Sequence, residues 1–276
     1  TDVTKNYAIT KANGKLTVNK KSVAVTWGST TTFTYNGNAQ APTASVTTGI
    51  SNETMTVTKT TGTNAGSYTS TASCSSVTGG QAKCSNYTLT GNTKAFTIID
   101  KTKPTMTLSV PNGTTLKSSR TATVTLSDSG GSGLTNSPIK IYYKLSTSSV
   151  ACSDMTQYIT ITPTSGSSTA TGTITPTVSN NGGKYKLYIC NKDSAISDKA
   201  GNSLAKSTLK SAAAYMETIN PGIYLTSSPS GTTYSKTKTI TVTLRDVGPN
   251  DGISGLTNSE VKIYYAWSTS SVACSS

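Results

Sequence analysis

The sequence contains no histidine, and this absence limits the chemistry that the chain can perform. Histidine is the usual general base of serine and cysteine triads and a common zinc ligand. Carboxylates are also few: the 276 residues include 11 Asp and Glu, and no pair is suggested by their spacing. We therefore expect no enzymatic activity. A Ser-Lys or paired-carboxylate arrangement assembled only in three dimensions stays open as an alternative.

Long hydrophobic runs are absent as well. No stretch approaches the roughly 20 apolar residues that span a bilayer, so we expect no membrane segment. Hydrophobic residues make up 33% of the chain and charged residues 13%, and Thr, Ser, Gly and Asn fill the difference. Such a composition favours short strands joined by many turns.

Arginine is scarce, although the chain is strongly basic. The formal net charge is +13, yet only Arg120 and Arg245 among the 24 cationic side chains are arginine. The lysines are scattered through all segments, whereas nucleic-acid binders cluster their charge and use arginine for bidentate base contacts. We expect a solvated basic surface and no nucleic-acid partner. Contact with polyanions such as cell-wall polymers is the alternative.

Two internal repeats set the domain organisation. Asn6–Thr10 matches Asn86–Thr90 at an offset of 86 − 6 = 80 residues, and each copy is followed by a Gly and an apolar strand. We therefore predict a whole unit over 21–100. Residues 1–20 would be the C-terminal tail of a truncated copy, forming one or two strands without a core of their own.

The second repeat is longer. Gly133–Ser137 recurs as Gly255–Ser259 at an offset of 255 − 133 = 122, and Lys140–Tyr143 recurs as Lys262–Tyr265. One whole unit is predicted over 101–219. Residues 220–276 are predicted to be the N-terminal half of a second, truncated copy.

Within each unit, apolar residues alternate with small or polar ones, which is the pattern of half-buried strands. The alternation is clear at Val23, Val25 and Trp27, at Ile139, Ile141 and Tyr143, and again at Ile240, Val242 and Leu244. Regular short strands with turns between them indicate an all-β fold of tandem β-sandwich domains.

The units resemble known bacterial repeats. Residues 21–100 resemble MBG-type repeats through Tyr35-Asn36-Gly37, Asn64-Ala65-Gly66-Ser67-Tyr68, Asn86-Tyr87 and Phe96-Thr97-Ile98. Residues 101–219 resemble bacterial Ig-like domains through Lys103-Pro104, Tyr185-Lys186-Leu187-Tyr188 and Asp198-Lys199-Ala200-Gly201-Asn202. MBG-type domains are small and β-rich, and they would precede the Ig-like sandwiches.

These resemblances imply a structural or adhesive stalk segment of a secreted or cell-wall-associated bacterial surface protein. Its partners would be host or cell-wall glycans or proteins, and no cofactor is implied. The alternative is a carbohydrate- or protein-binding module of an extracellular adhesin or enzyme.

The five cysteines point to disulfides. They form no C-x-x-C pair and have no histidine beside them, so a zinc site is improbable. The pairs Cys74–Cys84 and Cys152–Cys190 each lie inside one predicted unit, and bridges there imply an oxidising compartment. Cys274 occupies the position of Cys152 in the half copy, so its partner would fall beyond residue 276. Reduced thiols are the alternative.

Two further groups could carry a binding function. Asp246, Asn250 and Asp251 place three oxygen ligands in one glycine-containing loop, which makes them a weak calcium candidate against an ordinary polar turn; the corresponding loop of the preceding unit keeps Asp128. The aromatic side chains could form a sugar-stacking platform, although alternation favours core packing for half of each tyrosine pair. They are Trp27, Tyr142, Tyr143, Tyr264, Tyr265 and Trp267.

Overall fold

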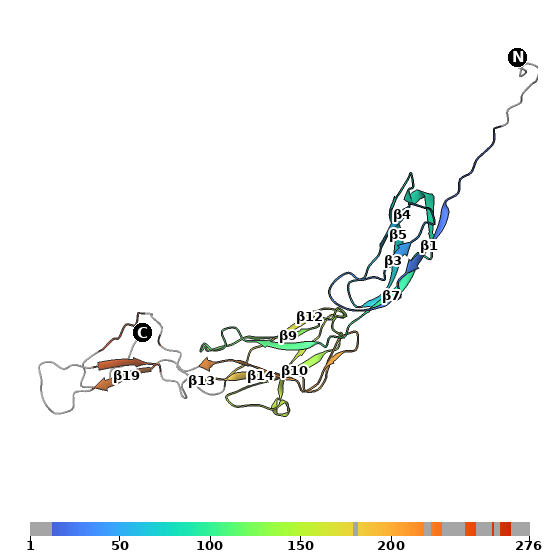
Figure 1. Cartoon of the computed structure of the whole chain (residues 1–276). Coiled ribbons are helices and arrows are strands. Elements are labelled where there is room, and N and C mark those ends of the chain that lie inside the picture. Colours follow the sequence, from blue (N-terminus) through green and yellow to red (C-terminus); the bar gives the residue numbers. More distant parts are fainter. Residues whose placement is uncertain are drawn as a thin grey trace, which may run out of the picture.

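The structure is a computed structural model, and it describes residues 13–178, 182–217, 222–227, 241–246, 256 and 260–265. Over these ranges it is built of strands and two short 3-10 turns, with no α-helix (Figure 1). The chain is therefore all-β, as the alternation predicts. No helix in the described ranges has the length and apolarity that crossing a membrane requires.

The N-terminal unit, residues 21–100, contains seven strands. They are β1 (Lys21–Trp27), β2 (Thr32–Thr34), β3 (Ala44–Val46), β4 (Thr54–Lys59), β5 (Gly66–Thr78), β6 (Tyr87–Thr90) and β7 (Thr93–Ile99), with the 3-10 turn η2 (Cys84–Asn86) before β6. Val23 and Val25 are buried while their neighbours on β1 are exposed, so the period-two pattern places one face in the core.

The strands of this unit hydrogen-bond in the order β2-β7-β5-β4-β3-β1-β6. β6 and β7 are almost continuous in sequence yet stand far apart in that order, so the sheet must curl back on itself. β1 pairs in parallel with β6, and β2 pairs in parallel with β7. Phe96 on β7 packs between Phe33 and Tyr68, with ring centroids 5.9 and 5.3 Å away.

The central unit, residues 101–217, has two main sheets. One has the order β11-β10-β14-β17 and the other β12-β9-β8. The strands are β8 (Thr105–Ser109), β9 (Ala122–Ser127), β10 (Ile139–Ser146), β11 (Gln157–Ile161), β12 (Thr169–Ile174), β13 (Gly182–Gly183), β14 (Lys186–Cys190), β15 (Ile196–Ser197), β16 (Ser203–Leu204), β17 (Leu209–Ala213) and β18 (Met216–Glu217), with the 3-10 turn η3 (Cys152–Asp154).

The two sheets pack face to face over one apolar core. Val124 and Leu126 on β9 meet Ile141 on β10 and Leu187 and Ile189 on β14, and all five side chains are fully buried. The arrangement is that of a β-sandwich, in which inward residues of both sheets interdigitate.

Each unit carries one disulfide. Cys74 and Cys84 are joined with a Cα–Cα distance of 5.7 Å, and Cys152 and Cys190 with 5.8 Å. These are the pairs that the repeats predict, and both distances lie within the limit of about 7 Å for a bridge. The second bridge ties the loop after β10 to β14 over a separate small cluster that contains Met155.

In the two flanking segments, only part of the expected strands is present in the described residues. Residues 13–20 form no strand, and Leu16 and Val18 are 88% and 85% exposed. The matching strand β7 pairs with β5 and β2, and no described residue offers such partners to residues 13–20. Further along, β19 (Gly222–Ser227) pairs with β20 (Thr241–Arg245), while 260–265, the copy of β10, forms no strand.

Candidate functional site at the junction of the two units

The N-terminal and central units meet where β7 ends, and Asp100 organises this junction. Its side chain accepts hydrogen bonds from the Thr102 backbone N–H at 2.7 Å and, across the junction, from the Ser132 hydroxyl at 2.6 Å and backbone N–H at 3.3 Å. Asp100 is only 7% exposed. The linker from Asp100 to Pro104 is therefore hydrogen-bonded to a loop of the central unit at the point where it leaves the N-terminal unit.

That loop follows β9 and is shaped by Asp128, which is 3% exposed. Its carboxylate accepts the backbone N–H groups of Gly130 at 3.0 Å and Gly133 at 2.7 Å. Gly133 has a φ of +76°, which favours glycine, and a Cβ there would lie 2.3 Å from the backbone of Gly166. The sequence thus closes the loop tightly enough to present Ser132 to Asp100.

The third acidic side chain comes from the Asp198–Asn202 motif. Asp198 accepts the Asn202 backbone N–H at 2.8 Å and its side-chain amide at 2.9 Å. The same Asn202 amide donates to the backbone carbonyl of Asp100 at 3.1 Å. The Asp198–Asn202 motif, which lies near the end of the central unit in sequence, therefore also binds the backbone at Asp100, where that unit begins.

The N-terminal unit contributes two more contacts. The backbone N–H of Ala65 donates to the carbonyl of Gly131 at 3.3 Å. A Cβ at Gly131 would lie 2.4 Å from the Tyr35 ring, and one at Gly130 would overlap the Asp100 carboxylate, so the two glycines allow a close approach that no larger residue would. Tyr35 and Ala65 belong to the Tyr35-Asn36-Gly37 and Asn64-Ala65-Gly66-Ser67-Tyr68 motifs of the sequence.

Asp100, Asp128 and Asp198 are the residues that could hold a metal here, because one oxygen from each lies within 4.8 Å of the others. Hard cations such as Ca²⁺ prefer this ligand type but take six to eight oxygens. All six carboxylate oxygens already accept hydrogen bonds from the chain. We interpret the cluster, called the aspartate lock below, as a hydrogen-bonded structural element.

The sequence reasoning found part of this site. It singled out Asp128 and Asp198 separately but not their meeting with Asp100, which lies 28 and 98 residues from them in the chain. The signal that could have found Asp100 is its place four residues before Pro104. Of the calcium candidate, Asp246 is buried, whereas Asn250 and Asp251 lie outside the described residues, as does Cys274.

The aromatic side chains of β10 do not form an exposed platform. Tyr142 is buried in the small cluster with Met155, and Tyr143 packs against the main core. The Tyr142 hydroxyl donates to Asp193 at 2.6 Å, and this hydrogen bond, with burial, raises the pKa of Tyr142 above its usual value.

The other members of the aromatic set differ from one another. The Trp27 indole N–H donates to the Gly91 carbonyl at 2.8 Å, a structural contact. Tyr264 and Tyr265 are 84% and 85% exposed. Their counterparts Tyr142 and Tyr143 are less exposed, and they lie on β10, which pairs with β11 and β14. Trp267 lies outside the described residues.

Comparison with protein-family models, with curated proteins and with solved structures found no match to the chain.

Proposed function

We propose that the chain is a load-bearing stalk segment of a secreted or cell-wall-associated bacterial surface protein, in which an MBG-type repeat is followed by Ig-like repeats. The aspartate lock is the observation that carries this proposal. A stalk must hold successive domains in a line, and a flexible linker would not do so. Here Asp100, at the start of the linker, is instead hydrogen-bonded to two loops of the central unit, through the Ser132 hydroxyl and the Asn202 side-chain amide.

The strand pairing of the N-terminal unit supports the same function. β6 and β7 together run over 87–99, so at about 3.3 Å per residue they span roughly 40 Å from the start of β6 to the junction. β1 begins beside the start of β6 and runs parallel to it. The start of β1 and the end of β7 therefore lie at opposite ends of the unit (Figure 1).

Tension along the stalk would then load the parallel pair β1–β6 in shear. In shear, the hydrogen bonds along the pair share the force and must break together, whereas a hairpin pulled open from its ends loses them one at a time. The Cys74–Cys84 bridge adds a covalent tie between β5 and the turn that leads into β6. A domain of this kind resists stretching along its long axis.

Single-molecule force spectroscopy tests the proposal. Handles attached at residues 20 and 101 load the N-terminal unit along the stalk axis. Handles at Thr54 and Thr78, which face each other across β4 and β5 and are both exposed, load the same unit as a zipper. We expect a clearly higher unfolding force for the axial handles. Equal forces, or a lower axial force, would reject a load-bearing role.

A further inference from the structure

A hollow lies on the central unit, away from the aspartate lock. It forms where β11 leaves β10: the two strands pair as far as Tyr143 and Gln157, and β10 then continues against β14 alone. Pro176 and Thr177, which follow β12, close another side. The resulting groove has a volume of about 280 Å³, just below the range of about 300 to 1,000 Å³ that is usual for sites of drug-sized ligands.

The wall that carries Asp154 and Gln157 is fixed by several contacts. The Cys152–Cys190 bridge anchors η3, and Met155 immediately after it is fully buried. The Lys192 ammonium group donates to the Met155 carbonyl at 2.9 Å. A wall held in place before binding lowers the entropic cost of taking up a ligand.

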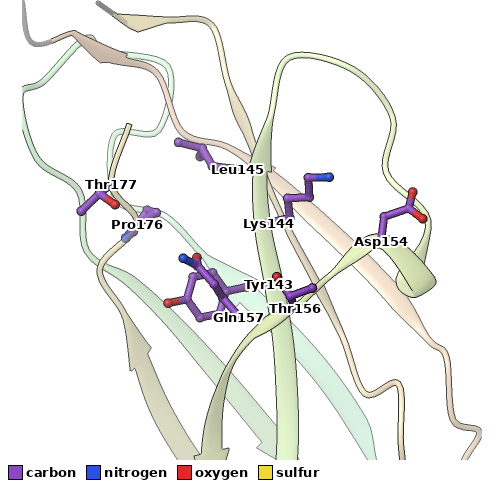
Figure 2. Close-up of a pocket in the computed structure, with 8 residues that line it drawn as sticks. All are labelled: Tyr143, Lys144, Leu145, Asp154, Thr156, Gln157, Pro176 and Thr177. Carbon is purple, nitrogen blue, oxygen red and sulfur yellow. The ribbon is translucent and has the colours of Figure 1, made fainter. Parts of the chain in front are cut away.

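The lining combines an aromatic ring with neutral polar groups and with one charged residue of each sign. In Figure 2, Tyr143, Gln157, Pro176 and Thr177 gather on one side of β10, and Lys144 and Asp154 lie on the other. Tyr143 is half-buried and Pro176 is buried, so these two offer fixed apolar surface, while the amide and hydroxyl groups offer both donors and acceptors.

We propose that this groove binds a single neutral sugar unit of a glycan. A sugar ring presents an apolar face of C–H groups and a rim of hydroxyls, which matches a tyrosine and a proline flanked by the Gln157 amide and the Thr177 hydroxyl. The small, open groove suits one exposed ring rather than a long buried chain. This proposal does not depend on the stalk function.

The charges of the lining select against ionic ligands. Lys144 and Asp154 contribute one charge of each sign, and both lie on the side of β10 away from Tyr143 (Figure 2). The side that carries Tyr143 and Pro176 therefore offers an ion no opposite charge, only the neutral Gln157 amide and Thr177 hydroxyl. An uncharged ligand with hydroxyl groups can bond to both.

Titration of the full chain, followed by amide chemical shifts, tests the proposal. The probes are methyl β-D-glucoside, methyl β-D-galactoside and N-acetylglucosamine, each added to tens of millimolar. We expect at least one to shift the amides of Lys144, Gln157 and Thr177 saturably, with a Kd on the order of 1 mM or weaker, as befits one ring with few hydrogen bonds. No saturable shift with any of the three, or shifts confined to other surfaces, would overturn the proposal.

Three variants locate the effect. Gln157→Ala and Tyr143→Phe each remove one hydrogen-bonding group without disturbing the strand, and each should weaken binding about fivefold or more. Tyr158→Ala is the matched control, since Tyr158 is 48% exposed on the opposite face of β11 and should bind as the unchanged chain does. Equal weakening by the control would contradict the assignment. The assignment would also be contradicted if a blocked four-residue peptide shifted the groove amides saturably while the three sugars caused no shift. The groove would then bind an extended peptide rather than a sugar.

Discussion

Replacing Asp100 with alanine removes the side chain that joins the two units most directly. The variant loses the hydrogen bonds from Ser132 and from the Thr102 backbone, and leaves the N–H group of the half-buried Ser132 without this acceptor. Hydrogen bonds to a charged group contribute about 1.5–3 kcal/mol each, and one of the three bonds is long at 3.3 Å. We therefore expect the free energy of unfolding of the central unit to fall by about 2–4 kcal/mol.

Urea denaturation measures this loss when it is followed by the methyl signals of Ile141 and Ile189, which are buried in the core of the central unit. Asp100→Asn should cost less than Asp100→Ala, because its remaining carbonyl oxygen still accepts one of the bonds. Glu260→Ala provides the control, since it removes a carboxylate from an exposed position of the described chain and should change little. If Asp100→Ala shifts the transition no more than this control, the aspartate lock stabilises nothing.

Three further predictions concern other parts of the chain. Replacing Cys152 and Cys190 together by alanine should lower the free energy of unfolding by roughly 4 kcal/mol, the chain-entropy value for a bridge across 38 residues, as urea denaturation would measure. Gly131→Ala should cost about 1–2 kcal/mol or more, because the residue has a φ of +86° and its Cβ would meet an aromatic ring across the junction; thermal unfolding against a silent surface variant checks it. Tyr142 should ionise at a higher pH than an exposed tyrosine in an ultraviolet pH titration, since its pKa is raised, first by the hydrogen bond to Asp193 and then by burial. The stability it contributes is present below pH about 10 and lost as the pH rises through its folded-state pKa, and Asp193→Asn should lower that pKa toward the usual value.

The elements were predictable where the sequence repeats or alternates. The period-two runs at Val23 and Val25 and at Ile139, Ile141 and Tyr143 became strands because each places one face in a core. The two cysteine pairs followed from their confinement to single units. These features depend on residues close in sequence or on one internal copy, so no knowledge of the whole fold was needed.

The junction and the groove were not predictable in the same way. Asp100 and Asn202 are 102 residues apart, and only the packing of the completed sandwich brings their loops together. Tyr143 looked like one half of a tyrosine pair, but its role depends on where β11 leaves β10 and on a proline after β12. The prediction of strands within residues 1–20 was wrong for residues 13–20, the part that the structure describes. A strand needs a neighbouring strand to pair with as well as an alternating sequence.

Residual dipolar couplings of backbone amides measure most directly whether the two units move as one body. For the unchanged chain, couplings from residues 21–99, 105–178 and 182–217 should fit a single alignment tensor together with the structure, because Asp100 and Ala65 of the N-terminal unit are hydrogen-bonded to loops of the central unit. Tensors that differ in magnitude or orientation between the two units would show that they move independently, and the stalk proposal would then lose its main support.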